Sequence, residues 1–361
     1  MRKKIAFLIC LSILAWLSPL DIDACTTFCM KDKNANPLYG RNFDFPIGLG
    51  QIHINQRNLQ KTSLIAAPER QFTWISKYGS ISFNQMGREF PYGGMNEAGL
   101  VIEQMMHENT GAQYPAPDDR YGLAELQWIQ YQLDVSASVN DVIASDKTVR
   151  ISYTSMAPLH FLVADASGNV AAIEYVDGKT VVHKGKDLKY PVLANETYDV
   201  SSANKMNLDA VSGKTGPENT KGYSDRFAKA ASMVEAFDPN SGSAVDYAFD
   251  ILKNVSQDKA TQWSIVYDLK KKTIYYRTRD NNNIRHIRLN LFDFSCTAAK
   301  LFVDIEENIG VVSDFKTYNY ESNLQLSESV CRNVEFLKQI PQEATIIRAK
   351  YPNSVTCVKN K

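Results

Sequence analysis

A cysteine, Cys25, lies directly after a segment with the pattern of a secretory signal. Residues 2–4 are Arg-Lys-Lys, and residues 5–17 form an almost unbroken apolar run that is too short for a typical membrane span. Ala24 supplies the small residue that commonly precedes a signal cleavage site. We therefore expect the protein to be exported to the periplasm or the cell exterior. Removal of residues 1–24 would make Cys25 the first residue of the mature chain.

An N-terminal cysteine combines a nucleophile and a base in one residue. A thiol must lose its proton to attack a carbonyl carbon, and a free α-amine, with an ordinary pKa of about 7.7–8.0, can accept that proton near pH 7. The stretch 40–44 reads Gly-Arg-Asn-Phe-Asp. We expect a hairpin to return it to Cys25, where Arg41 would lower both pKa values and Asp44 would orient the amine. The pattern indicates amide hydrolysis through an acyl-enzyme.

Two other interpretations of the cysteine remain open. Residues 22–25, Ile-Asp-Ala-Cys, loosely resemble a lipoprotein signal, and lipidation would block both the thiol and the amine. The protein would then be a lipoprotein with a binding or structural role. A histidine-dependent cysteine peptidase is the other alternative. The local signatures of papain and caspase nucleophiles are missing around Cys25, and each of the five histidines is better explained as structural: His53, His107, His160, His183 and His286.

The remaining cysteines leave the disulfide pattern undecided. Cys10 would be lost with the signal, which leaves an odd number in a compartment where disulfides form. If Cys25 is the free thiol, the other four allow three pairings, or they could all stay reduced. These four are Cys29, Cys296, Cys331 and Cys357.

Composition indicates a folded enzyme-sized chain. The sequence has 361 residues, of which 44% are hydrophobic and 22% charged, and its formal net charge is zero. This balance favours neither nucleic acid nor an anionic membrane as a partner. After the signal, we find no apolar segment long enough to span a membrane, no linker and no glycine-rich phosphate loop. We expect residues 25–361 to form one domain.

Alternating and helical patterns predict two β-rich blocks interleaved with helices, which suggests sheets covered by helices. We expect strands at 26–30, 38–45, 78–83, 101–105, 160–164, 170–175, 180–183, 262–268, 273–279 and 286–292. We expect helices at 123–134, 139–144, 224–237, 243–255 and 331–340. Residues 92–100 are interpreted as a turn and residues 200–222 as polar and irregular.

Several of these stretches together resemble one family. The Cys-Thr pair at 25–26, the motif at 40–44 and Gly-Met-Asn-Glu-Ala-Gly-Leu at 94–100 are similar to the choloylglycine hydrolase family. This family belongs to the N-terminal-nucleophile (Ntn) hydrolases and includes bile salt hydrolases and penicillin V acylases. The similarity continues, in order, through 159–161, 173–175, 192–195 and 224–227.

The resemblance implies a fold and a set of catalytic residues. The fold would be α+β, a four-layer αββα sandwich of two stacked antiparallel sheets. Cys25 would be the nucleophile, Arg41 and Asp44 would prepare its amine, Asn195 would donate to the oxyanion, and Arg226 would hold the site. Taken singly, the last four also fit a cross-strand ion pair, a turn residue and a helix surface residue. The resemblance implies no cofactor and no metal.

The resemblance does not fix the substrate, because the sequence departs from the family pattern at one position. Bile salt hydrolases carry a characteristic asparagine, and penicillin V acylases a tyrosine, where this chain has Met106. Together with Phe45 and Ile47, Met106 would suit a hydrophobic acyl group. The partner would be a small-molecule amide: a bile salt conjugate, a penicillin V-like compound or another N-acyl amine. The family also suggests that the protein could assemble as a homo-oligomer.

Overall fold

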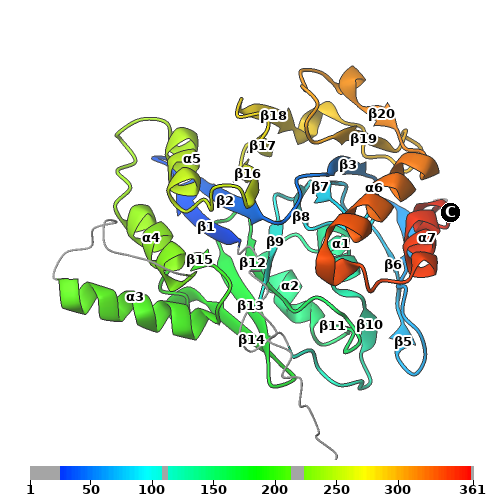
Figure 1. Ribbon diagram of the computed structural model, residues 1–361, viewed down its shortest axis with the longest axis horizontal. Helices are drawn as coiled ribbons and strands as arrows, with labels where there is room; N and C mark the ends of the chain where they lie inside the picture. Colours follow the sequence, from blue (N-terminus) through cyan, green and yellow to red (C-terminus); the bar gives the residue numbers. More distant parts are fainter. Residues whose placement is uncertain (1–24, 108–112, 213–222, 359–361) are drawn as a thin grey trace, which may run out of the picture.

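Two large antiparallel sheets lie face to face, with helices on their outer sides (Figure 1). The structure is a computed structural model that describes residues 25–107, 113–212 and 223–358. The predicted signal, residues 1–24, lies outside these ranges. Among the described residues, none of the helices has the length and apolar character that crossing a membrane requires.

The first sheet contains the predicted hairpin next to Cys25. Its strand order is β15-β1-β2-β16-β17-β18. In the β1–β2 ladder Thr26 lies opposite Asn42, so the residue before β1 lies close to the end of β2. The strands are β1 (Thr26–Lys31), β2 (Pro37–Asp44), β15 (Val192–Leu193), β16 (Thr261–Asp268), β17 (Thr273–Thr278) and β18 (Arg285–Arg288).

The second sheet has the order β14-β13-β12-β9-β8-β7-β3-β19-β20. Its strands are β3 (Gln51–Asn55), β7 (Ser80–Asn84), β8 (Gly93–Asn96), β9 (Val101–Met106), β12 (Leu159–Ala164), β13 (Val170–Val176), β14 (Lys179–Lys184), β19 (Leu301–Asp304) and β20 (Lys316–Thr317). The stretch predicted as a turn is thus partly strand β8. A side chain on Gly94 would meet the carbonyl oxygen of Ile81 at 2.4 Å, so a glycine is required where β8 runs beside β7.

Helices cover the outer faces of the two sheets. On the first sheet, α4 (Tyr223–Glu235) packs against β1, and α5 (Ala244–Asn254) packs against β2 and β16. On the second sheet, α1 (Glu125–Val135) and α2 (Val139–Ser145) enclose a separate apolar core. Tyr39 on β2 donates a hydrogen bond to the carbonyl of Leu162 on β12, which links the inner faces. The predicted αββα sandwich is confirmed.

Two small sheets extend this sandwich. One has the order β11-β10-β5 and is parallel, and the other has the order β21-β4-β6 and is antiparallel. Their strands are β4 (Leu59–Thr62), β5 (Arg70–Gln71), β6 (Thr73–Ile75), β10 (Tyr121–Leu123), β11 (Val149–Ile151) and β21 (Thr356–Cys357).

A helix replaces much of the stretch that was predicted as irregular. α3 spans Tyr198–Ser212, and the rest of the stretch, residues 213–222, is outside the described part of the chain. The prediction was wrong because polar side chains occupy the inward face. Buried positions recur at helical spacing but are mostly not apolar: Tyr198, Ser201, Ser202 and Lys205.

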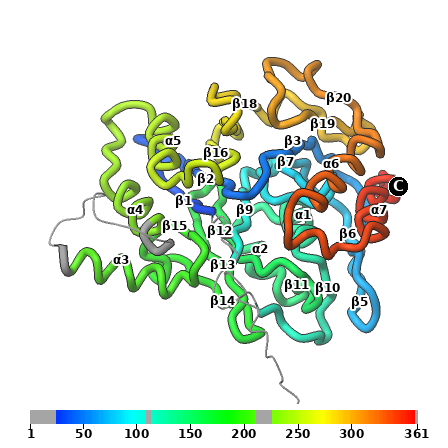
Figure 2. Tube along the Cα trace, in the orientation of Figure 1, coloured from blue at the N-terminus to red at the C-terminus, as the bar shows by residue number. Residues whose placement is uncertain are grey.

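The predicted helix at 331–340 was also wrong in its bounds. The chain forms α6 (Tyr320–Asn333), a short 3₁₀ turn (Glu335–Leu337) and then α7 (Gln342–Lys350). α6 begins early because the Asn319 side chain accepts a hydrogen bond from the backbone of Ser322 at 2.8 Å. In Figure 2 this C-terminal segment is red, and its last strand, β21, pairs with β4.

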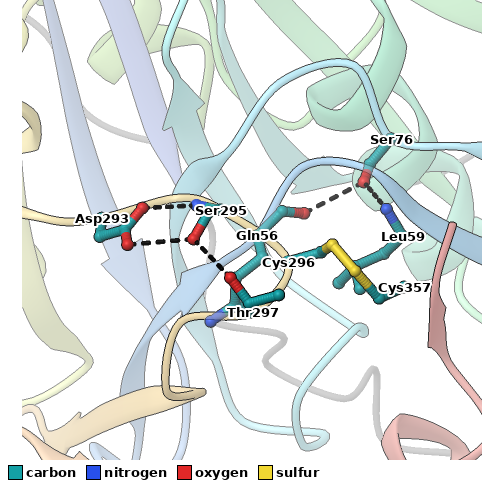
Figure 3. Close-up of a disulfide and its surroundings, with 8 residues drawn as sticks. All are labelled: Gln56, Leu59, Ser76, Asp293, Ser295, Cys296, Thr297 and Cys357. Carbon is teal, nitrogen blue, oxygen red and sulfur yellow. Dashed lines mark hydrogen bonds between the residues drawn. A yellow bond between two sulfur atoms is a disulfide. The ribbon is translucent and has the colours of Figure 1, made fainter. Parts of the chain in front are cut away.

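One disulfide fixes the C-terminal segment to the loop after β18. It joins Cys296 and Cys357, whose Cα atoms are 5.4 Å apart (Figure 3). The other two candidates, Cys29 and Cys331, are buried free thiols, as is Cys25. The sequence had allowed three pairings of two bridges, and the structure instead has this single bridge among its described residues.

Acid should destabilise the fold through a buried histidine. His53 is fully buried on β3, stacks on Phe302, and has no hydrogen-bond partner for either ring nitrogen within the described residues. Burial, with a smaller contribution from Arg88, lowers its pKa well below the usual value. The folded state therefore keeps His53 neutral, whereas the unfolded chain takes up a proton below about pH 6.5, so stability falls as the pH drops through that value.

The measurement is urea unfolding at pH 7 and pH 5.5. We expect the wild type to lose about 1 kcal/mol to this one group between the two values, and His53→Leu to lose that much less. An unchanged difference between the two pH values in His53→Leu would contradict the assignment.

Candidate active site

The Cys25 thiol lies where the ends of β1 and β2 meet. Its Sγ atom is 3.8 Å from the carbonyl oxygen of Asp44 and 3.8 Å from Nη2 of Arg41. The antiparallel register explains this placement, because Thr26 lies opposite Asn42, so Cys25, one residue earlier, comes level with Phe43 and next to Asp44, the last residue of β2. The structure thus brings Cys25, Arg41 and Asp44 together.

Arg41 is held by the second sheet. Its Nη1 donates to Glu103 Oε2 at 2.6 Å and its Nη2 donates to the carbonyl of Gln104 at 3.0 Å, both on β9. The Tyr267 hydroxyl donates to the other Glu103 oxygen. Arg41 therefore pairs with Glu103, and the cross-strand ion pair with Asp44 that the sequence allowed does not form.

Glu103 is a functional neighbour that the sequence analysis missed. Burial raises its pKa to about 7, against the opposing effects of Arg41 and the Tyr267 hydroxyl. A side chain at Gly93 would come within 1.9 Å of the Glu103 carboxylate, so the glycine makes room for it. The available signal was an acidic residue in an otherwise uncharged strand, Val-Ile-Glu-Gln-Met-Met.

Arg226, from α4, links the other predicted residues. Its Nη1 lies 3.2 Å from the carbonyl oxygen of Cys25, 3.2 Å from the hydroxyl of Thr26 and 3.5 Å from Asp44 Oδ2. Its Nη2 lies 3.4 Å from Asn195 Oδ1. The guanidinium thereby joins the start of β1, the end of β2 and the loop that contains Asn195. A planar group with five donors can make these contacts at the same time.

The side chains of Asp44 and Asn195 are both fixed. Asp44 Oδ1 accepts a hydrogen bond from Thr261 at 2.5 Å, which turns the other oxygen toward Arg226. Asn195 Nδ2 donates to the carbonyl of Met106 at 2.7 Å. An amide nitrogen carries two hydrogens, so Asn195 keeps a second donor beyond this bond.

While residues 1–24 are still attached, the surroundings of the Cys25 thiol do not lower its pKa. Burial raises the pKa of Cys25; Arg41 opposes this, and the Asp44 carboxylate adds to it. The sequence had suggested that Arg41 would lower this pKa, but the loss of solvent outweighs the single cation. Among the described residues, the hydrogen bonds of the thiol join it to Asp44 and Arg41 and to no histidine. Deprotonation therefore needs a base from another source.

Three of the five histidines gather on one carboxylate. His160 Nδ1 lies 3.0 Å and His183 Nε2 3.3 Å from Glu174, and His107 lies 3.8 Å from the same group. The ligand atoms of His107, His160 and Glu174 are close enough together to suggest a metal site. However, the other nitrogen of His160 lies 2.7 Å from the carbonyl of Ala194, so both of its ring nitrogens are already hydrogen-bonded. The cluster instead fixes the chain beside Asn195.

A cavity of about 310 Å³ lies beside Cys25. Cys25 and Asp44 form part of its wall, and Phe45 and Met106 also line it. Arg41, Asn195 and Arg226 are not among the described residues that line it. Ile47, which was predicted to contact the acyl group, does not line it either and packs against the main core. The wall is largely apolar; it also includes Phe43, Tyr92, Leu126, Phe336 and Leu337.

Comparison with known proteins agrees with this geometry. Residues 25–302 match the linear amide C-N hydrolases, choloylglycine hydrolase family. The chain belongs to this family. It is therefore a hydrolase of carbon–nitrogen bonds in linear amides, with penicillin V acylases and bile salt hydrolases among its relatives.

Individual relatives cover most of the chain. It is 28% identical to the penicillin V acylase of Pectobacterium atrosepticum over 324 residues, which span 77% of this chain and 85% of the relative. It is 25% identical to the bile salt hydrolase/transferase of Lactiplantibacillus plantarum, spanning 72% of this chain and 90% of that protein.

Solved structures of two proteins from this family have the same fold as this chain. The penicillin V acylase of Agrobacterium tumefaciens matches with a TM-score of 0.68 and 26% identity, covering 82% of this chain and 98% of that one. A variant of conjugated bile acid hydrolase from Clostridium perfringens matches with a TM-score of 0.64 and 20% identity, covering 80% and 98%. At that identity the second likeness supports the fold alone.

Proposed function

We propose that the protein is an exported amidase that uses Cys25, as the N-terminal residue of its mature chain, to hydrolyse an N-acyl amide. The observation that carries the proposal is the position of the thiol. It opens on a largely apolar cavity while Arg41, Asp44 and Arg226 hold the chain around it. The family match also begins at Cys25.

The free α-amine of Cys25 is the base that the raised thiol pKa calls for. In the precursor this nitrogen is part of a peptide bond and cannot accept a proton. After cleavage behind Ala24, the amine takes the proton from Sγ, and the thiolate attacks the amide carbonyl carbon. Asp44 orients the amine, and Arg41 supplies positive charge 3.8 Å from the sulfur.

Attack forms a carbon–sulfur bond and moves a pair of electrons onto the carbonyl oxygen. The second hydrogen of Asn195 Nδ2 stabilises this oxyanion. The side-chain amide of Asn195 is held in place by Arg226 and by the Met106 carbonyl. Collapse breaks the carbon–nitrogen bond as the Cys25 ammonium returns its proton to the leaving amine. Water, deprotonated by the same amine, then attacks the thioester, and the acid is released as Cys25 regains its proton.

The apolar lining favours a hydrophobic acyl group, with Phe45 and Met106 in contact with it. Bile salt conjugates, penicillin V-like amides and other N-acyl amines all fit this description. The relatives named for bile salts and penicillin V support the first two classes.

The test is the mass of the exported protein, purified after expression with its own signal. We expect an unmodified chain of residues 25–361, and N-terminal sequencing that begins Cys-Thr-Thr. Brief reaction with an N-acyl amide and acid quenching should add the acyl group to the peptide that contains Cys25. A diacylglyceryl mass on Cys25 would support the lipoprotein alternative and exclude the mechanism, and cleavage elsewhere would remove the base.

A further inference from the structure

The buried carboxylate of Glu174, on β13, joins both ends of the loop that carries Asn195 between β15 and α3. At the start of this loop, the carbonyl oxygen of Ala194 lies 2.7 Å from Nε2 of His160, and Nδ1 of the same ring lies 3.0 Å from Glu174. At the end of the loop, the backbone N–H of Tyr198 donates to the two Glu174 oxygens at 3.0 and 3.1 Å. The loop is thus fastened to the second sheet on each side of Asn195.

The chemistry of this anchor follows from its burial and its hydrogen bonds. Burial raises the pKa of Glu174, but its hydrogen bonds with His160 and His183 outweigh this and lower the pKa to about 2. Near neutral pH the carboxylate is therefore ionised and can only accept hydrogen bonds. The Ala194 carbonyl can also only accept, so His160 donates through both ring nitrogens to make its two bonds.

The side-chain contacts of Asn195 do not replace this backbone anchor. Nδ2 donates to the Met106 carbonyl and Oδ1 lies 3.4 Å from Arg226, which together fix the rotation of the amide group. The position of that group still depends on the backbone that carries it. A catalytic donor must stay within about 0.5 Å of its productive position, and a misplacement of about 1 Å can lower turnover about 100-fold.

We propose that Glu174, acting through His160 and the backbone of Tyr198, positions Asn195 to stabilise the oxyanion. This rests on the proposed function, in which Asn195 is the oxyanion donor. Glu174 is not among the described residues that line the cavity, so it is a positioning residue and not a catalytic one. Its loss should lower kcat and leave KM nearly unchanged, because the oxyanion exists only after attack on the carbonyl.

The experiment is a double-mutant cycle on the turnover of penicillin V, or of glycocholate if the wild type hydrolyses that amide faster. Asn195→Ala should lower kcat about 100-fold or more, because it removes an oxyanion donor. Glu174→Met should lower kcat about 10- to 100-fold and keep KM within about threefold. Added to Asn195→Ala, Glu174→Met should lower kcat by less than about twofold, because the donor that Glu174 positions is already missing.

Two further variants of the anchor separate its geometry from its burial. Glu174→Gln should keep kcat within about threefold, because its oxygen can accept from Tyr198 and its nitrogen can bond to His160. His160→Phe keeps a ring but removes the bond to Ala194, so it should lower kcat as Glu174→Met does. It tests the same anchor if Glu174→Met does not fold.

Asp165→Leu is the matched control. Asp165 is also buried, directly after β12, and its carboxylate accepts hydrogen bonds from the backbone of Val139 at 3.0 Å and of Ser167 at 2.9 Å. It therefore anchors a different loop in the same way. Its loss should lower stability but keep kcat within about threefold of the wild type.

Hydrogen exchange tests the anchor without a substrate. The Tyr198 amide should exchange at least about tenfold faster in Glu174→Met, and at the wild-type rate in Asp165→Leu. An unchanged rate in Glu174→Met would overturn the proposal even if neither amide is hydrolysed.

The proposal is also overturned if the losses from Glu174→Met and Asn195→Ala multiply in the double variant. The same holds if Glu174→Met leaves kcat unchanged, or if Asp165→Leu lowers kcat to the same extent. These outcomes leave the amidase mechanism intact, because Asn195→Ala alone still lowers kcat. An unchanged kcat in Asn195→Ala would instead remove Asn195 from the proposed mechanism, and the role of Glu174 with it.

Discussion

Replacing Cys25 with alanine should abolish amide hydrolysis without unfolding the protein. Loss of a catalytic nucleophile lowers turnover by about 10⁴-fold or more, because the acyl-enzyme can no longer form. The thiol makes two contacts of 3.8 Å, so its removal should cost only about 1 kcal/mol of stability. The measurement is turnover of an N-acyl amide under single-turnover conditions, together with urea unfolding.

Cys29, on the strand β1 that follows Cys25, offers a matched control. It is also a buried free thiol, and burial raises its pKa to about 12, so it is unreactive near neutral pH. Cys29→Ala should keep turnover within about threefold of the wild type. If Cys25→Ala retained activity, or if Cys29→Ala lost it to the same extent, Cys25 would not be the nucleophile.

Much of this site follows from short-range pattern in the sequence. The alternation of residues 26–30 and 38–45 predicts a hairpin, and a hairpin with this register necessarily returns Arg41 and Asp44 to the start of β1. Local pattern is sufficient here because the participants lie within twenty residues of one another. The two β-rich blocks and their helices predicted sheets covered by helices, whereas the αββα sandwich itself was implied by the family resemblance.

The partners of these residues were not predictable, because they come from distant segments. Arg41 meets Glu103 across the interface of the two sheets, and sheet stacking is not encoded in the period of either strand. Arg348 lines the cavity from α7, a helix that the sequence analysis did not predict. α3 was missed for a related reason, since its buried face contains Ser201, Ser202 and Lys205, and hydropathy alone assigns such residues to solvent.

Lys61 is a charged residue whose burial could not be predicted from hydropathy. It is fully buried on β4, yet no apolar pattern would place it there. Its Nζ lies 2.5 Å from Glu89 and 2.9 Å from Asp134, and Asp134 also accepts a hydrogen bond from Trp74 at 2.8 Å. Burial alone would lower the pKa of Lys61, but the carboxylates of Asp134 and Glu89 outweigh it and raise the pKa. Its contribution to stability is therefore complete below about pH 10 and lost only above its raised pKa.

Lys61→Met should destabilise the fold by about 3–5 kcal/mol, because, among the described residues, it leaves the buried carboxylate of Asp134 without a cation and leaves Glu89 with Arg88 alone, 3.9 Å away. Lys338→Met is the control: its Nζ also lies 2.5 Å from a glutamate, Glu335, but both side chains are more than half exposed. An exposed pair at the same distance contributes only about 0–1 kcal/mol, so burial is the variable that differs.

The pH dependence of the Lys61→Met variant separates charge from packing. Burial already raises the pKa of Asp134 to about 6 while Lys61 opposes that rise, so loss of Lys61 raises this pKa further, and the folded variant binds more protons than the wild-type fold above about pH 6. Its stability should rise as the pH falls through that range, and its deficit relative to the wild type should narrow. Urea unfolding at pH 7.5 and pH 5.5 measures this directly. A deficit that stays constant with pH would mean that lost packing of the lysine side chain, rather than unpaired charge, causes the destabilisation.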